Sequence, residues 1–571
     1  MPVKPIPYGI SNYSTIIRDG YAYVDKTMYI RTLEQAGVYH LFLRPRRFGK
    51  SLFTSMLGYY YDIAEIDNFD RLFSNMDIGR NPTKKKNAYY VLQFDFSAIR
   101  TDSYEVMLQS FTQNIYNAFV RFCATYHLDI TLEMDSPEAQ LSHLFTQFQT
   151  KCDGKIYVII DEYDHFANEL LSSNLKTFTD TVSGDGFIRT WYEVLKWASK
   201  TVVERIFITG VSPITLDSLT SGFNISKNLS TNSTFNEMMG FTRNEVEQLI
   251  QETISEKLPF DLMDTLTDYY NGYCFSKDGK ERVFNSDMVL YYLDSCQQEH
   301  KRPDTLLDRN AVSDYGKLER LIRFQTPEQN LDILKEIVFT GHTTAHLVER
   351  YFIGQRFEAE HFKSLLFYLG LITIKEEHLG FLVLQIPNSA TTGLYFDFLM
   401  RLIVDETNYI PDTSNIAQAI YQLAYENEIE KLIVLVEGLL HAISNRDSIG
   451  FSEKEIKIAV AAYSGMTNLY LIKSEYEVEK RYIDLAFFPR DANSELDVLL
   501  FELKYIKKSD VPDPNSPEGG KMIQEKCLEA RKQLQDYGSA KEFSHKKVSA
   551  WAIVFVGDSC VKRERMTFEP F

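Results

Sequence analysis

The stretch RPRRFGKS at residues 44–51 decides the fold of the N-terminal part of this chain. Its last three residues fit the phosphate-binding loop G-x-x-x-x-G-K-[ST], and Arg44 stands where that pattern has its first glycine. An apolar run precedes the stretch and a helical pattern follows it, which is the context that the motif requires. Backbone N–H groups at such a helix start bind phosphate, Lys50 would reach the β- and γ-phosphates, and Ser51 would ligate Mg²⁺.

Short apolar runs, separated by segments of helix length, recur through the first 230 residues. Continuous apolar runs of this kind are typical of strands that are buried on both faces of a parallel sheet. The sequence therefore predicts an α/β domain in which the 44–51 loop follows one strand. The four runs lie at 39–43, 89–96, 155–161 and 205–211.

A second motif, YVIIDE at residues 157–162, consists of four apolar residues and two acids. As a buried strand it would deliver both carboxylates to its C-terminal edge. Asp161 would then hold the Mg²⁺ shell, and Glu162 would orient or polarise the attacking water. The run near 205–211 offers Thr209 and Ser212 as contacts for the γ-phosphate, with ordinary strand-end capping as the alternative for both.

The composition is that of a folded protein of about three to four domains. The chain has 571 residues, of which 44% are hydrophobic and 25% charged, which excludes disordered and collagen-like classes. No apolar run approaches the roughly 18 residues of a membrane-spanning helix, and the N-terminus lacks the features of a signal peptide. We therefore expect a cytoplasmic protein without membrane association. Six cysteines without a CxxC pair give no basis for a zinc ribbon.

Segments spread over about residues 5–290 together resemble the AAA-ATPase-like family of bacterial and archaeal proteins. In that family an arginine commonly replaces the first loop glycine, so Arg44 is a family feature. The resemblance implies an ATP-binding P-loop core with a small helical lid, and it leaves Arg46 and Arg47 as contacts for phosphate or for a neighbouring subunit. The segments are IPYGISNYSTIIRDGYAYVDKT, LFLRPRRFGKSLF, VIIDEYD, FITGVSPI, YYNGYCF and VFNSDMVLYYL.

Helical patterns dominate the middle of the chain. Within it, residues 360–387 read as helix, strand, turn at Gly380 and strand, which fits a winged helix and equally other small α+β units. We expect four parts: a P-loop AAA-ATPase-like core at 1–235, a helical lid at 236–305, a helical or winged-helix-like connector at 306–444, and a C-terminal α/β domain at 445–571.

Three charged side chains form a second constellation near the C-terminus. Asp484 lies in RYIDL, and Glu502 and Lys504 lie in FELK. Adjacent strands would bring Asp484 close to Glu502, while Glu502 and Lys504, two apart on one strand, share a face. Two converging carboxylates repel each other unless a divalent cation lies between them. With a lysine to orient or deprotonate water, this is the chemistry of metal-dependent phosphodiester hydrolysis.

The pattern D-x17-E-x-K resembles the PD-(D/E)xK nuclease superfamily over about residues 445–560. Its branch that closes AAA-ATPase-like proteins is similar to this chain at SE (474–475), RYIDL, FELK and the Q-x-x-x-Y of Gln533 and Tyr537. Two departures are Tyr482 within RYIDL and the lack of a glycine before Arg481.

The resemblance also implies an acidic residue on the first helix of the nuclease-like domain. Glu453 and Glu455 both serve, and Glu475 is the competing assignment. Residues 501–571 carry a net charge of +2 in a chain of −18, so their basic residues could follow a phosphate backbone. These residues are Lys507, Lys508, Arg531, Lys532, Lys546 and Lys547.

Together these patterns predict an ATP-binding, ATP-hydrolysing protein coupled to a metal-dependent nuclease domain. The cofactors would be ATP and Mg²⁺ or Mn²⁺, and the partner nucleic acid, DNA in preference to RNA; self-association stays open. The alternative is a nucleotide-regulated switch, or a nucleic-acid-binding adaptor with a non-cleaving nuclease domain. Catalytic candidates are Asp484, Glu502, Lys504, Gln533 and Glu162; nucleotide-binding candidates are Arg47, Gly49, Lys50, Ser51, Asp161 and Thr209; metal-binding candidates are Ser51, Asp161, Asp484 and Glu502.

Overall fold

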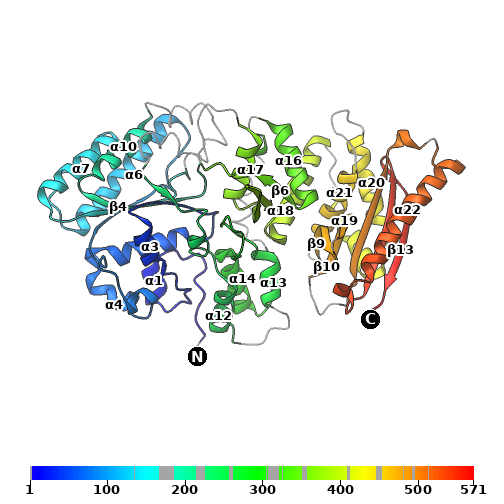
Figure 1. Ribbon diagram of the computed structural model, residues 1–571, viewed down its shortest axis with the longest axis horizontal. Coiled ribbons are helices and arrows are strands. Elements are labelled where there is room, and N and C mark those ends of the chain that lie inside the picture. Colours follow the sequence, from blue (N-terminus) through cyan, green and yellow to red (C-terminus); the bar gives the residue numbers. More distant parts are fainter. Residues whose placement is uncertain are drawn as a thin grey trace. The chain divides into compact units, whose positions relative to one another are not determined.

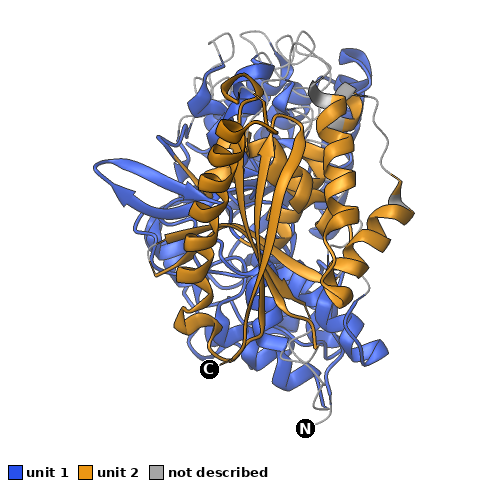
Figure 2. Cartoon of the chain, turned by 90° about the vertical axis from the view of Figure 1, so that its right-hand side faces the viewer, with its two compact units in different colours: residues 1–258, 262–333, 344–387 blue, residues 259–261, 334–343, 388–571 orange. Residues whose placement is uncertain are grey.

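The structure is a computed structural model (Figure 1). Its chain forms two compact units, coloured separately in Figure 2: residues 1–258, 262–333 and 344–387 make the first, and residues 259–261, 334–343 and 388–571 the second. The expected division into four parts is finer than this and stays a prediction. The structure describes residues 3–133, 135–165, 186–213, 225–255, 262–303, 305–306, 321–323, 326–349, 357–407, 412–444, 453–467, 469–479, 481–490, 495–511 and 513–570.

A five-stranded parallel sheet forms the centre of the first unit, with the strand order β2-β3-β4-β1-β5. The four predicted apolar runs are confirmed as its first four strands. Because helices cover both faces, each strand needs apolar side chains on both sides, which is why these runs are continuous. The strands are β1 (Tyr39–Leu43), β2 (Tyr90–Asp95), β3 (Ile156–Asp161), β4 (Val203–Gly210) and β5 (Lys227–Asn228).

Helices lie on both faces of this sheet, with α6, α7 and α10 on one side and α1, α3 and α4 on the other (Figure 1). Further helices follow the sheet in sequence. The helices of this part are α1 (Tyr13–Arg18), α2 (Tyr29–Ala36), α3 (Lys50–Tyr61), α4 (Phe69–Phe73), α5 (Asp77–Arg80), α6 (Tyr104–Thr125), α7 (Pro137–Lys151), α10 (Phe187–Ala198), α12 (Arg243–Thr253), α13 (Leu262–Tyr270) and α14 (Ser286–Glu299).

The predicted helix, strand, turn and strand at 360–387 are confirmed as α17 (Ala359–Tyr368), β7 (Thr373–His378) and β8 (Phe381–Gln385). Leu379 and Gly380 connect the two strands, with φ angles of 50° and 84°. Two consecutive residues with positive φ make the turn whose twist matches that of an antiparallel hairpin. Before this hairpin the chain forms α16 (Pro327–Thr340) and β6 (His342–Ala345).

The second unit contains another five-stranded sheet, with the order β13-β12-β11-β10-β9. Strands β11 and β12 are parallel, and the other neighbours are antiparallel. Helix α22 joins the parallel pair, as such a crossover requires. The elements are α18 (Ser389–Thr407), α19 (Thr413–Tyr421), a π-helical turn (Gln422–Glu426), α20 (Glu430–Ser444), α21 (Glu453–Gly465), β9 (Tyr470–Val478), β10 (Arg481–Pro489), β11 (Val498–Ile506), α22 (Pro517–Gly538), β12 (Val548–Val556) and β13 (Ser559–Phe568).

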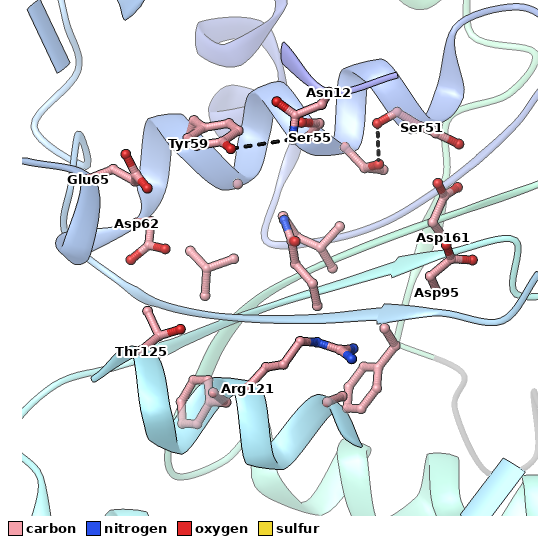
Figure 3. Close-up of a pocket in the computed structure, with 18 of the residues that line it drawn as sticks. Asn12, Ser51, Ser55, Tyr59, Asp62, Glu65, Asp95, Arg121, Thr125 and Asp161 are labelled. Atoms are coloured by element: carbon pink, nitrogen blue, oxygen red, sulfur yellow. Dashed lines mark hydrogen bonds between the residues drawn. The ribbon is translucent and has the colours of Figure 1, made fainter. Parts of the chain in front are cut away.

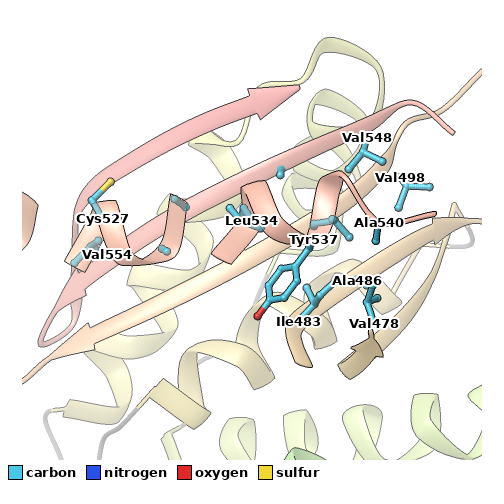
Figure 4. Packing of buried hydrophobic residues seen from close by; sticks show 14 of the residues in the cluster. Val478, Ile483, Ala486, Val498, Cys527, Leu534, Tyr537, Ala540, Val548 and Val554 are labelled. Atoms are coloured by element: carbon cyan, nitrogen blue, oxygen red, sulfur yellow. The ribbon is translucent and has the colours of Figure 1, made fainter. Parts of the chain in front are cut away.

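One apolar face of α22 packs on this sheet and forms a hydrophobic core (Figure 4). Cys527, Leu534 and Tyr537 recur at helical spacing along that face, opposite strand residues such as Val548 and Val554. The helix begins after Ser516, whose hydroxyl accepts the amide of Gly519, with proline in its first turn. Within the described residues, no helix is long and apolar enough to cross a membrane.

The sequence patterns do not predict strand β13 (Ser559–Phe568). Its sequence, SCVKRERMTF, has no fully buried side chain in the structure. An edge strand has one neighbour and keeps much of its surface in water, so it needs no regular apolar alternation. The pattern that reveals a central strand is therefore missing here.

Arg44, at the missing glycine of the loop, is a buried structural residue with 1% of its surface exposed. Its guanidinium donates to the carbonyl oxygens of Ser230 at 2.7 Å and Phe235 at 2.9 Å. It also lies over the rings of Phe42 and Phe275, 4.2 and 4.1 Å from their centroids. Burial lowers its pKa to about 9, which leaves the group cationic at neutral pH. Arg44 thus fastens the end of β1 to the segment around residues 230–235.

Replacing Arg44 by glycine, the residue of the general motif, should destabilise the first unit. The variant leaves buried carbonyl oxygens without donors, which costs about 1–3 kcal/mol for each such group. We expect a lower urea midpoint and faster hydrogen exchange in β1. Arg18→Ala, at an exposed position of α1, is the control and should change the free energy of unfolding by less than about 0.5 kcal/mol. Equal stability of the two variants would contradict the anchoring role.

Candidate nucleotide and metal sites

The 44–51 loop ends in a backbone geometry that suits an anion. Gly49 has a φ of 85°, a conformation that glycine adopts without steric cost, and α3 begins at the next residue. The first N–H groups of a helix have no partner within it and point outward. A cavity of about 660 Å³ lies in front of this helix start, and Gly49, Lys50, Ser51 and Glu162 are among its lining residues.

Lys50 is held over the loop by two oxygen atoms. Its ammonium donates to the carbonyl oxygen of Pro45 at 3.1 Å and lies 3.9 Å from Glu162 Oε1. The side chain is 4% exposed, so the charge is confined to this place. Glu162 itself follows β3 directly, with a φ of 54°. The loop and the end of β3 therefore bring Lys50 and Glu162 together, as the two motifs require.

Ser51 and Asp161, the two predicted Mg²⁺ ligands, contact each other. Asp161 is the last residue of β3, and the Ser51 side chain lies close to its carboxylate. Burial raises the pKa of Asp161 to about 6, and the polar Ser51 side chain opposes that rise. A hydroxyl beside a buried carboxylate is an oxygen donor pair of the kind that Mg²⁺ prefers, so these residues fit the ion.

Asp95 is a further acidic residue at this place, and the sequence reasoning missed it. It ends β2 directly beside Asp161 in the parallel register, and its charge contributes to the raised pKa of Asp161. The signal was present in the sequence, because the run YYVLQFDF carries an acid near its end just as YVIIDE does.

A second cavity, of about 550 Å³, extends along α3 from the Ser51 and Asp161 pair (Figure 3). Asp95 and Asp161 lie at one end of it and Asp62 at the other, with Arg121 of α6 across from α3. The two cavities share Ser51 and Asp95. The end of the first cavity where phosphate is expected thus shares lining residues with the second, polar cavity beside α3.

Arg47 and Ser212, two of the predicted nucleotide contacts, have other partners in the structure. Arg47 lines the 660 Å³ cavity, and its guanidinium forms an ion pair with Asp287 at 2.6 Å. Thr209 is fully buried and does not line that cavity. Ser212 donates its hydroxyl to Asp164 at 3.1 Å, which ties the end of β4 to the end of β3. The placement of Ser212 is that of strand-end capping, and a phosphate contact by Thr209 stays a prediction.

The C-terminal constellation is assembled by the adjacent strands β10 and β11. Asp484 Oδ2 accepts the amide of Leu503 at 2.8 Å, which holds this carboxylate next to the FELK segment. Lys504 Nζ lies 2.9 Å from Glu502 Oε1, as expected for residues two apart on one strand. The structure therefore brings Asp484, Glu502 and Lys504 together.

Glu502 has the chemical character of a ligand for a cation. It is 2% exposed, and within the described part of the chain its Oε2 atom has no hydrogen-bond partner. Burial, followed by the charge of Asp484, raises its pKa to about 7 even though Lys504 opposes the rise. A buried carboxylate oxygen without a partner is costly, and a divalent cation would satisfy it. The described residues contain no ready-made group of three acid, histidine or cysteine ligands, so water or backbone oxygens would complete the shell.

Lys457 of α21 is a functional candidate that the sequence reasoning missed. Its ammonium lies 2.6 Å from Asp484 Oδ1 and 2.7 Å from Glu475 Oε1. Burial alone would lower the pKa of Lys457, but Asp484 and Glu475 outweigh it and raise that pKa. A signal existed in the stretch EIKIAVAAY, where one lysine stands among apolar residues on every side of a helix. Such a lysine is buried only with an acidic partner.

The three candidates for the first-helix acid lie in two different places. Glu453 and Glu475 both face Lys457, at 3.5 and 2.7 Å. Glu455 faces the other way and lies 3.8 Å from Lys335. The first two are therefore near Asp484, and Glu455 is not part of that group of contacts.

Gln533 and Tyr537 lie one helical turn apart on α22. The Tyr537 hydroxyl donates to the carbonyl oxygen of Tyr482 at 2.9 Å. Burial and then the charges of Glu502 and Asp484 raise the pKa of Tyr537 to about 12. Among the described residues, Gln533 Oε1 is buried without a partner. This pair thus borders the carboxylates.

Two of the basic residues proposed to contact a phosphate backbone form ion pairs within the domain. Arg531 lies 2.6 Å from Glu564, and Lys547 lies 3.6 Å from Asp497. Lys546 lies over the ring of Phe488, 5.2 Å from its centroid. The role of these side chains toward nucleic acid stays a prediction.

Two family models match the chain, one over each of the ranges that contain these candidate sites. Residues 7–220 match the model of a family described as "Predicted AAA-ATPase", and residues 451–565 match that of the PD-(D/E)XK nuclease superfamily. A protein of Azotobacter chroococcum mcd 1, named "Uncharacterized protein in vnfD 5'region", is 27% identical over 297 residues. The match covers 51% of this chain and 52% of that protein, so it spans about half of each. The N-terminal part of the chain is thus similar to the AAA-ATPase-like family, and its C-terminal part is similar to the PD-(D/E)XK nuclease superfamily.

Proposed function

We propose that the protein binds and hydrolyses ATP at the 44–51 loop and cuts nucleic acid at the Asp484 site with a divalent cation. The observation that carries the nuclease proposal is the buried Glu502 carboxylate, which lies beside Lys504 and has one oxygen without a described partner. Burying such a group is unfavourable for stability alone. Its placement makes sense if a cation completes the site.

At the nucleotide site, Lys50 would exchange the Pro45 carbonyl for phosphate oxygens, and the N–H groups of the α3 start would bind the same phosphates. Ser51 and Asp161 would hold Mg²⁺, which would offset the negative charge of the phosphates. Glu162, close to Lys50, would orient the attacking water and accept its proton.

At the nuclease site, Asp484 and Glu502 would hold Mg²⁺ or Mn²⁺, which when bound polarises the phosphodiester and acidifies a water molecule. Lys504 stays beside Glu502 and would orient that water or stabilise negative charge on the phosphate. The Leu503 amide fixes Asp484, so the two carboxylates keep their positions when a cation binds. We propose DNA in preference to RNA as the substrate.

Lys504→Ala should lower cleavage by at least about 100-fold, the usual contribution of a group that stabilises transition-state charge, and leave ATP binding unchanged. Cleavage of labelled DNA and RNA with Mn²⁺, beside a chelator control, measures the first effect, and a fluorescent ATP analogue measures the second.

Lys521→Ala is the control for Lys504→Ala, because this lysine is largely exposed at the start of α22. It should cut like the wild type. Cleavage that survives in Lys504→Ala would refute the assignment. Binding of nucleic acid by the wild type with no cleavage under any metal would favour the adaptor instead.

Lys50→Ala should abolish ATP binding, whereas Glu162→Gln should keep ATP binding and lower hydrolysis by about 100-fold or more. The reason is that Lys50 faces the phosphates, while Glu162 acts on the water. Phosphate release and nucleotide affinity, measured side by side, separate the two effects. Lys84→Ala, at an exposed position, is the control, and equal behaviour of all three variants would contradict the proposed roles.

Glu502→Gln should stabilise the metal-free protein increasingly as pH rises. In the folded chain the pKa of Glu502 is about 7, above its ordinary value of 4.5. A raised carboxyl pKa means that the folded state loses stability as pH rises from the lower value to the higher one. The neutral glutamine avoids this loss, so its advantage should grow over that range and level off above about pH 7.

The measurement is urea unfolding with a chelator at several pH values, followed by far-UV and near-UV circular dichroism. Glu525→Gln is the matched control, since Glu525 is exposed on α22. Its stability relative to the wild type should not follow pH in this way. A pH-independent difference for Glu502→Gln would show that Glu502 ionises as freely as an exposed glutamate.

A further inference from the structure

Lys457 makes more ionic contacts than the two lysines assigned above. Its Nζ atom lies 2.6 Å from Asp484, 2.7 Å from Glu475 and 3.5 Å from Glu453. Three carboxylate side chains on three different elements, α21, β9 and β10, thus surround one ammonium group. The Lys457 side chain is 9% exposed, so water screens these contacts little.

The carboxylates around Lys457 would repel one another without it. The antiparallel register pairs Ile483 with Tyr476 and Leu485 with Ser474, which leaves Asp484 opposite Glu475. Like charges at directly opposed positions of two strands are unfavourable. Glu475 also has a φ of 48°, a rare conformation for a residue with a side chain. The positive charge of Lys457 therefore offsets the repulsion between these carboxylates.

The second half of the site is organised differently. Glu502 has Lys504 on Oε1 and no described partner on Oε2, although the residue is 2% exposed. With every side chain charged, the four carboxylates of Glu453, Glu475, Asp484 and Glu502 face two ammonium groups. The net charge of these six groups is then −2, which one divalent cation would neutralise. Glu529, which is near Lys504, is paired with Lys526 at 2.7 Å and does not alter this balance.

We propose that Lys457 takes the place of a second metal ion, so that this site binds one divalent cation, at Asp484 and Glu502, and not two. Phosphodiester hydrolysis in proteins also uses pairs of metal ions about 3.5–4 Å apart, so the number of ions is a real distinction. Lys457 is a positioning residue here, because it acts through Asp484. The inference rests on the proposed nuclease function.

Counting bound Mn²⁺ ions by electron paramagnetic resonance tests the inference. The full-length protein, free of nucleotide and carrying Asp161→Asn to empty the nucleotide site, should bind one Mn²⁺. Adding Glu502→Gln should reduce the count to zero, which locates the ion. Adding Lys457→Met should raise the count to two, with the magnetic coupling of neighbouring ions, because Glu453, Glu475 and Asp484 then lack their cation.

Two further variants separate the charge of Lys457 from its packing. Lys457→Arg keeps the charge and should keep the count at one. Lys473→Met is the matched control, because Lys473 lies on β9 over the rings of Tyr476 and Phe488, 5.1 Å from each centroid. It should also bind one ion. A count of one in folded Lys457→Met would overturn the inference.

The count in the Asp161→Asn protein without a further substitution decides the matter if Lys457→Met does not fold: one ion supports the inference and two overturn it. Two ions with metal-dependent cleavage would leave the proposed nuclease function standing and reject only the role of Lys457. No bound Mn²⁺ at all, together with no cleavage, would overturn both.

Discussion

A charged group leaves water only where an opposite charge or a set of hydrogen bonds replaces its hydration, and this constraint shapes both units. In the first unit, the buried guanidinium of Arg44 finds carbonyl oxygens and aromatic faces. In the second, Lys457 finds carboxylates. Asp161 and Glu502 differ, because burial still raises the pKa of each. The burial of these two carboxylates is not fully offset by their neighbours, as expected if each one holds a cation as proposed.

The sequence predicts best those elements whose apolar pattern follows directly from which of their faces are buried. Strands β1, β3 and β4 are buried on both faces, so each one is a nearly continuous apolar run, whereas β2, at the edge of the sheet, leaves Gln93 and Asp95 exposed. Helix α22 carries its apolar residues at helical spacing because only one of its faces meets the sheet. The sequence does not reveal β13, whose side chains stay partly in water. The spacing of apolar residues in the sequence thus indicates which side chains are buried.

The candidate sites were predictable where the spacing along one element sets the geometry. Glu502 and Lys504 meet because they are two apart on β11, and Ser51 follows from the loop. Lys457 and Asp95 were missed because their roles depend on pairing between distant elements. Arg44 looked like a loop residue, and only the packing of residues 230–235 reveals its structural role.

Two glutamates at the candidate sites have a strained backbone. Glu162 and Glu475 both have positive φ angles, 54° and 48°, and both lie beside the lysines that define their site. Such conformations cost about 1 kcal/mol or more for a residue with a side chain and persist only where the surroundings hold them. At Glu162 the amide of His165 donates to its carbonyl oxygen, which closes the turn.

Strand β13 has a consequence for how the protein behaves in a crowded cell. Lys562, Arg563, Glu564 and Arg565 follow one another along this outer strand, and the register with β12 shifts between Val554 and Phe555. Charged side chains and a local irregularity both discourage a foreign strand from adding to an open sheet margin. This edge of the C-terminal sheet is therefore protected against amyloid-like stacking, although the outer backbone groups of β13 have no neighbouring strand in the described part of the chain.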